Sequence, residues 1–220
     1  MNDTTQNQVI SNTIIFVKKT LADAEGGHDW FHIERVWKNT KLIGKTESVD
    51  IFIAELGALL HDIADSKFHD GDEEIGPKTA RAFLLTQDVD EETIEHVENI
   101  IRHISFKGSL EGQKWSSPEL DVVQDADRLD ALGAIGIART FNYGGFKGRG
   151  LYNPDIPPNL NMTKEEYKNS TAPTLNHFQE KLLLLKDKMN TDTGKRLAQK
   201  RHEYLESFHE EFIAEWNGER

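Results

Sequence analysis

The sequence predicts an all-α protein. Apolar residues recur at intervals of three and four along most of the chain, which is the spacing of the buried face of a helix. Polar stretches with glycine and proline separate these segments, and no segment alternates strictly between polar and apolar residues as a strand does. The 220 residues are 37% hydrophobic, enough for one sizeable core. The absence of cysteine excludes disulfides and thiolate metal sites.

Three helices are expected in the first third of the chain. The first covers residues 9–22, where apolar residues have helical spacing. Asp29 can cap the second helix, which carries His32 and Ile43. The third helix covers residues 49–64 and is the most apolar segment of the chain.

Two shorter helices are expected next. Residues 65–77 are polar and contain glycine and proline, so they are expected to form a loop. A short helix runs through Ala80–Leu85. Asp90 can cap the following helix, which turns Ile94 and Ile101 inward and ends near residue 103.

The second half of the chain is also expected to be helical. After a loop at residues 105–115, Ser117 and Pro118 start a helix, with a capping residue followed by proline. Small residues at 131–138 indicate close helix contact, and residues 142–160 are expected to be irregular. Thr163 and Glu166 form a capping box for a region that becomes leucine-rich ahead of Met189. An amphipathic helix with apolar residues from Leu197 to Trp216 ends the chain.

Four residues with metal-binding side chains stand out. His61 and Asp62 are adjacent at the end of the apolar third helix, where ionisable groups are costly unless they are paired or bind a metal. His32 lies on the preceding helix and Asp127 on a later one. Two imidazoles and two carboxylates from three helices suit a divalent cation of intermediate softness.

The net charge of −12 makes a long nucleic acid an unlikely partner. The N-terminal residues resemble no signal peptide, and no run of about 18 apolar residues occurs that could span a membrane. The sequence therefore predicts a cytoplasmic protein with neither a long nucleic acid nor a membrane as its partner.

The four residues carry a resemblance to a known family. The order His32, His61-Asp62 and Asp127 resembles the H…HD…D pattern of the HD-domain superfamily of metal-dependent phosphohydrolases. The flanking segments IERV, IADSKF and DADRLDALGAIGIAR are similar to those of the small bacterial HD hydrolases. The resemblance covers residues 20–150. It implies an HD-domain helical bundle and a single HD domain over residues 1–220, with a metal-binding core at 20–150 and a C-terminal helical extension at 160–217.

The resemblance also implies an activity. His32, His61, Asp62 and Asp127 would hold one divalent transition metal, with manganese preferred, iron, cobalt, nickel or zinc as alternatives, and magnesium less suitable. Water activated by the metal would attack phosphorus in a nucleotide or a small phosphate ester. Because some relatives cleave nucleoside triphosphates, a nucleoside triphosphate pyrophosphohydrolase is one candidate.

Further site residues follow from the resemblance or from position. In the family, the position of Asp65 lies near the metal-bound water, so Asp65 is expected to act as a general base or to bind that water, and Lys67 can hold a substrate phosphate. Several relatives place a histidine where His103 stands, which favours a phosphate contact or a proton donor to the leaving oxygen. A solvated helix end is the structural alternative for Asp65 and Lys67.

Four residues of the second half are predicted to help bind the substrate. Asp130 lies one helical turn after Asp127 and can orient a ligand or form an ion pair with Arg128 or Arg139.

Arg139, Lys147 and Arg149 can contact phosphate. Glycines surround Lys147 and Arg149, and an ordinary solvated loop is the alternative there.

Two other functions compete with the phosphohydrolase. The chain could be a catalytically silent HD module that binds a nucleotide or metal as a sensor, which a turnover assay with manganese would decide. It could also be a helical interaction protein whose His and Asp residues are structural, which predicts no bound metal. The amphipathic C-terminal helices could complete the monomer or form a homodimer interface.

Overall fold

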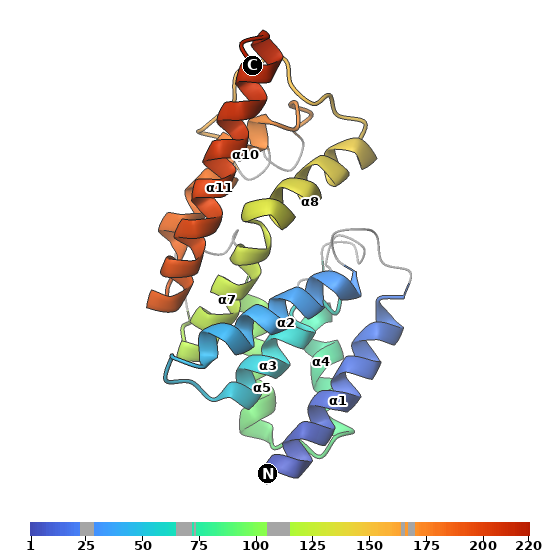
Figure 1. The fold of residues 1–220 in the computed structure, drawn as a ribbon. Helices are drawn as coiled ribbons and strands as arrows, with labels where there is room; N and C mark the ends of the chain where they lie inside the picture. The colour runs from blue at the N-terminus through green and yellow to red at the C-terminus, as the bar shows by residue number, and fades with distance from the viewer. Residues whose placement is uncertain (23–28, 65–71, 73, 105–114, 164–165, 167–169) are drawn as a thin grey trace. The chain divides into compact units, whose positions relative to one another are not determined.

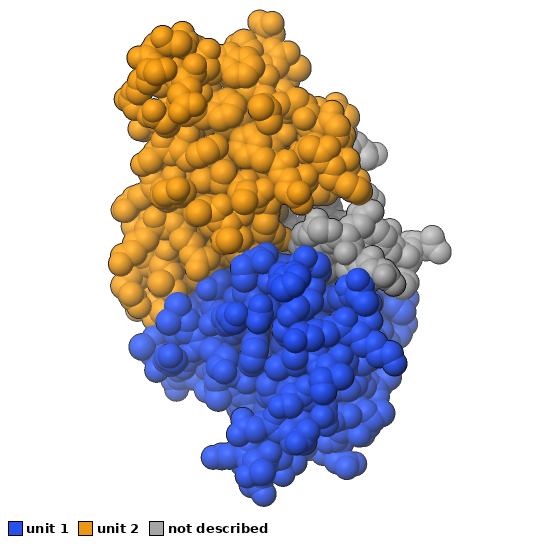
Figure 2. Space-filling view, turned by 45° about the vertical axis from the view of Figure 1, so that its right-hand side comes forward, with its two compact units in different colours: residues 1–127 blue, residues 128–220 orange. Residues whose placement is uncertain are grey.

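The protein is built of helices, which confirms the all-α fold class (Figure 1). This computed structural model describes residues 1–22, 29–64, 72, 74–104, 115–163, 166 and 170–220. The chain forms two compact units, Met1–Asp127 and Arg128–Arg220, which Figure 2 shows in different colours. In the described ranges no helix has both the length and the apolar composition needed to span a bilayer.

Unit 1 is organised around helix α3, which is apolar almost throughout. This helix packs against α1, α2 and α5, and α4 packs on α5. At Gly57 of α3 an added Cβ would lie 3.0 Å from the Ile100 side chain, so glycine allows α3 and α5 to approach closely. The helices of unit 1 are α1 (Asp3–Thr20), α2 (Trp30–Gly44), α3 (Ile51–Leu60), α4 (Ile75–Leu85), α5 (Glu91–His103) and the larger part of α7 (Pro118–Asp130).

Capping residues determine where several of these helices begin. The carboxylate of Asp29 accepts the backbone N–H of His32, and that of Asp90 accepts the N–H of Thr93. Both caps confirm the predicted helix starts. The Asp29 cap also orders the first turn of α2, the turn on which His32 lies.

Several predicted boundaries in unit 1 were wrong. Helix α1 spans Asp3–Thr20 rather than residues 9–22. Helix α3 ends at Leu60 rather than at residue 64, so His61 and Asp62 lie in the turn that follows it. Helix α4 begins at Ile75, inside the predicted loop 65–77. Pro77 is compatible with this start because the first turn of a helix has no intrahelical partners for its N–H groups.

Unit 2 is built on the long helix α11, which packs against α8 and η2. Its core is aromatic: the rings of Phe141, Phe178, Phe208 and Phe212 lie 5.7 to 6.1 Å apart in contacting pairs. The helices of unit 2 are α8 (Gly133–Phe146), α10 (Asn176–Glu180), the 3₁₀ helix η2 (Leu182–Lys188) and α11 (Asp192–Asn217).

The prediction that residues 142–160 are irregular was wrong for the first five of them. Helix α8 continues to Phe146, its C-cap is Lys147, and the following Gly148 has a φ of 65°, which is typical of the residue after a helix C-terminus. Gly144 is required here for packing, because a Cβ at this position would lie 2.1 Å from Oγ1 of Thr174. Tertiary contact therefore outweighs the low helix propensity of glycine.

Candidate metal centre

Three predicted ligands from three elements of unit 1 come together. His32 is in the first turn of α2, His61 directly follows α3, and Asp127 lies on α7. One possible ligand atom from each residue lies within 4.8 Å of those of the other two. His32 is 2% exposed and His61 7% exposed, so both imidazoles are buried, where a polar group needs a hydrogen-bond partner or a metal ion.

The imidazole rings of His32 and His61 point their Nε2 atoms at each other. The Nε2 atoms of His32 and His61 are 3.3 Å apart. Oδ1 of Asp127 lies 3.5 Å from Nε2 of His32 and 4.0 Å from Nε2 of His61. Oδ2 of Asp62 lies 3.7 and 3.8 Å from the same two nitrogens, so both carboxylates border the space between the imidazoles.

The tautomer of His61 follows from its backbone contact. Its Nδ1 lies 2.8 Å from the carbonyl oxygen of Ala58. A carbonyl only accepts, so Nδ1 of His61 donates and carries the ring proton. In the neutral ring, Nε2 then has a free lone pair directed at His32. A hydrogen bond from the second ring nitrogen is the usual arrangement for a metal-binding histidine.

These residues fit a divalent metal ion. Atoms bound at about 2.0–2.2 Å from one ion lie roughly 3–4.4 Å from each other, depending on geometry. All the distances given above between the nitrogens and the carboxylate oxygens fall in that range. A mixed set of imidazole nitrogens and carboxylate oxygens suits manganese, iron, cobalt, nickel or zinc better than magnesium. His32, His61, Asp62 and Asp127 could therefore hold one such ion.

Two side-chain amides anchor α7 next to Asp127. Asn39 on α2 donates to the carbonyl of Ala126 at 3.4 Å. Gln124, which is 1% exposed, donates to the carbonyl of His103 at 2.8 Å. These bonds connect α7 to the helix of His32 and to the end of α5. Neither amide was identified from the sequence, because an amide on a helix has no local pattern that names its partner.

His103 is held in a defined orientation at the end of α5. Its Nδ1 donates to the carbonyl of Asn99 at 2.8 Å, which leaves Nε2 as an acceptor in the neutral ring. The ring also lies 5.7 Å from that of Trp115. With Nδ1 held by Asn99, Nε2 is the nitrogen that could take up a proton, and the imidazolium so formed could make the predicted phosphate contact or proton transfer.

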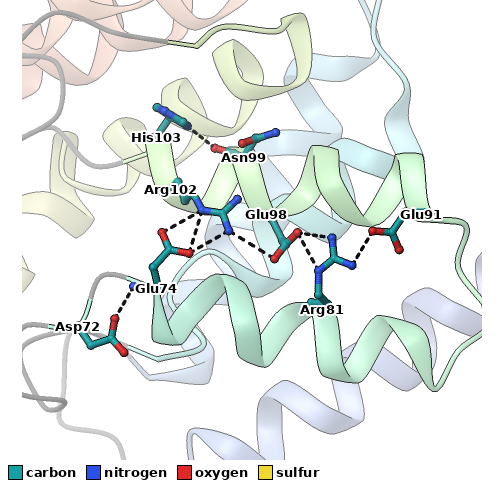
Figure 3. Close-up of polar contacts among 8 residues, drawn as sticks. All are labelled: Asp72, Glu74, Arg81, Glu91, Glu98, Asn99, Arg102 and His103. Carbon is teal, nitrogen blue, oxygen red and sulfur yellow. Dashed lines mark hydrogen bonds and ion pairs between the residues drawn. The ribbon is translucent and has the colours of Figure 1, made fainter.

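An ion-pair network fixes the same turn of α5 (Figure 3). Glu98, 5% exposed, accepts from Arg81 at 2.6 and 3.0 Å and from Arg102 at 3.5 Å. Arg102 also contacts both carboxylate oxygens of Glu74, at the start of α4. Arg81 contacts Glu91 at 2.6 Å. The network joins α4 to the last turn of α5, where helices otherwise tend to fray.

The network also shifts the pKa values of its members. Hydrogen bonds and the charge of Arg102 lower the pKa of Glu74. The hydrogen bonds that Arg81 donates to the carboxylates of Glu98 and Glu91 raise its pKa. These groups therefore stay ionised near neutral pH, and the buried carboxylate of Glu98 is compensated by two guanidinium groups.

The remaining predicted site residues lie in unit 2 or outside the described residues. Asp65 and Lys67 lie outside the described residues. In unit 2, Nη1 of Arg139 donates to Oδ2 of Asp130 at 2.6 Å, which is the ion pair that the sequence left open. Lys147 and Arg149 come together on the ring of Tyr143, each 5.6 Å from its centroid.

Comparison with known proteins agrees with this site. The profile of the HD domain matches residues 30–132, a segment that contains all four predicted ligands. The Bacillus subtilis protein YpgQ, described as uncharacterized, is 40% identical over 195 residues, or 88% of this chain and 86% of YpgQ. The chain belongs to the HD-domain family.

Solved structures of HD proteins extend the similarity to nearly the whole chain. An HD-superfamily hydrolase from Bacillus thuringiensis is 46% identical, with a TM-score of 0.76 over 96% of this chain and 98% of that one. The crystal structure of B. subtilis YpgQ in complex with ADP is 35% identical, with a TM-score of 0.76 over 96% of both chains. This HD protein is thus similar to its relatives beyond the matched domain.

Proposed function

We propose that this HD protein is a metal-dependent phosphohydrolase that acts on a nucleotide. The observation that carries the proposal is the pair of buried imidazoles whose Nε2 atoms lie 3.3 Å apart beside two carboxylates. Two unprotonated nitrogens this close repel each other unless a proton or a cation lies between them. Nitrogen and oxygen donors from three elements supply the ligands for such a cation.

A divalent transition metal at this site would lower the pKa of a bound water to near neutral and polarise a phosphoryl oxygen. His32, His61, Asp62 and Asp127 would hold the ion. Asp65 would accept the proton of the attacking water. In its imidazolium form, with Nδ1–H donating to the carbonyl of Asn99, His103 would give its Nε2 proton to the oxygen that leaves phosphorus and become neutral.

Cationic residues would bind the phosphates of the substrate. Lys67, Lys147 and Arg149 are the proposed contacts, because each offers N–H donors with positive charge. Asp130 and Arg139 are proposed to support them, with Asp130 orienting the guanidinium of Arg139 through their ion pair.

A nucleotide is the proposed substrate class for two reasons. The sequence resembles small HD hydrolases that include nucleoside triphosphate pyrophosphohydrolases, and the similar protein YpgQ has been crystallised with ADP. The −12 charge disfavours a long nucleic acid. Release of pyrophosphate from a nucleoside triphosphate is the proposed reaction. A catalytically silent module that binds the nucleotide is the alternative.

The test is a turnover assay with product identification. Purified protein is incubated with nucleoside mono-, di- and triphosphates in manganese, cobalt or magnesium, and products are separated by ion-exchange chromatography. The proposal predicts a nucleoside monophosphate and pyrophosphate from a triphosphate. If orthophosphate is the first product, the protein is a phosphatase and not a pyrophosphohydrolase. Nucleotide binding without turnover under any metal would favour the sensor.

A further inference from the structure

A cluster of cations and aromatic rings lies at the C-terminal end of α8 in unit 2. Nζ of Lys147 lies 5.6 Å from the ring centroid of Tyr143 and 5.1 Å from that of Phe146. The guanidinium carbon of Arg149 also lies 5.6 Å from the Tyr143 centroid. Tyr143 is 47% exposed and Phe146 59% exposed, so two rings and two cations share one open surface.

The cations of this cluster are not neutralised by carboxylates of the described residues. Arg149 donates to the neutral carbonyl of Ser170 at 2.5 Å, and no described acidic residue forms an ion pair with Lys147 or Arg149. Two like charges beside one ring repel each other. Among the residues that the structure describes, the cluster is therefore a positive surface without an ion-pair partner, in a chain whose net charge is −12.

The segment that carries Arg149 is fixed in place. The backbone N–H groups of Thr174 and Leu175 donate to the carbonyls of Gly150 and Leu151, each at 2.9 Å. Two residues later, burial first and then the charges of Lys181 and Arg149 lower the pKa of His177 to about 3. Burial is the main cause of this shift, and the charge of Arg149 contributes in the same direction.

The glycines around the cluster leave open space. A Cβ placed on Gly145 or on Gly150 would meet no atom within 4 Å. Gly145 lies in the last turn of α8, where glycine costs roughly 0.5–1 kcal/mol relative to alanine. Because packing does not require glycine at these two positions, the free space beside the cations is available to a ligand.

Helix capping explains only part of this arrangement. The C-terminal end of a helix carries about half a negative charge, which attracts a cation such as Lys147 and repels an anion. Two full positive charges exceed that half charge. The helix dipole also does not account for two exposed aromatic rings, whose burial against a ligand would be favourable.

We infer that unit 2 carries a nucleotide-binding surface of its own, formed by Tyr143, Phe146, Lys147 and Arg149. The cations bind the phosphates, and the exposed ring of Phe146 stacks on the base. The inference extends the proposed function by naming residues that recognise a nucleoside di- or triphosphate. It also requires that this binding persists without the metal ligands of unit 1.

The experiment measures ADP binding in the presence of a chelator by isothermal titration calorimetry. Asp127→Asn removes a predicted metal ligand and is expected to leave chelator-resistant ADP binding unchanged. The double variant Lys147→Ala, Arg149→Ala is expected to weaken ADP binding at least tenfold. The double variant Arg196→Ala, Lys200→Ala, which removes an exposed arginine and an exposed lysine of α11, is the control with the same charge change and should bind normally.

Two further variants separate the parts of the surface. Phe146→Ala should weaken ADP several-fold and leave inorganic pyrophosphate unaffected, because only ADP has a base. Lys147→Arg keeps the charge and should retain most of the affinity, with circular dichroism confirming the fold of each variant.

Normal ADP binding by the double variant Lys147→Ala, Arg149→Ala, or complete loss of ADP binding in Asp127→Asn, would overturn the inference. If these binding results hold and no phosphate ester is cleaved, the proposed function fails and the nucleotide surface stands.

Discussion

His61 directs its Nε2 at Nε2 of His32 from 3.3 Å because its other ring nitrogen donates to the carbonyl of Ala58. Without that bond the ring could turn or take the other tautomer. The end of α3 thus supplies both the histidine and the acceptor that orients it.

His61→Ala and Asp127→Asn should abolish stoichiometric manganese binding and leave most of the helicity. Each substitution removes one ligand atom, which is expected to lower the affinity for manganese so far that the ion is lost on desalting. Metal content after manganese loading and desalting, with far-ultraviolet circular dichroism, measures both effects. His103→Ala is the matched control, since it removes an imidazole that is not in the cluster and should keep the metal. A full manganese complement in either ligand variant would contradict the site.

The choice of metal is expected to follow the donor atoms. Manganese or cobalt should support turnover of the nucleotide, and magnesium should support little, because imidazole nitrogens suit the transition metals better. Initial rates after chelator treatment and re-addition of each ion test this. A clear magnesium optimum would show that the working site is richer in oxygen ligands than proposed.

Glu98→Gln should lower the free energy of unfolding by roughly 1–3 kcal/mol, because it weakens hydrogen bonds to two guanidinium groups at a buried position. Glu91→Gln removes a charge that also contacts Arg81, but at an exposed position, and should cost less than about 1 kcal/mol. Urea unfolding of the two variants gives the comparison. Equal losses of unfolding free energy in the two variants would mean that the burial of Glu98 does not strengthen its interactions with the arginines.

The low pKa of His177 predicts a pH dependence of stability. The unfolded chain binds this proton near the ordinary pKa of 6.5, whereas the folded protein binds it only near 3. Between these values the unfolded state binds more protons, so the free energy of unfolding decreases as the pH is lowered.

The variant His177→Asn cannot take up that proton. Its stability should therefore decrease less steeply between pH 6.5 and pH 4 than that of the wild type. Unfolding curves at several pH values measure both slopes, and parallel slopes would rule out His177 as a contributor.

Sequence periodicity predicted the helical class and most helix positions. The Asp29 and Asp90 caps were found because a cap depends on residues three positions apart. Boundaries were less predictable where tertiary contact outweighed local preference. Gly144 continues α8 because it packs against Thr174, a residue thirty positions away.

The sequence by itself determined which residue types could bind a metal and that they lie on or directly after separate helices, since helical spacing is a local property. Their roles as ligands stay a prediction. Only the tertiary structure decided that His32, His61 and Asp127 converge, and that Tyr143 gathers two cations. The burial of Glu98 between two arginines was decided in the same way. Such contacts depend on how helices distant in sequence pack, and no local spacing encodes which side chains will meet.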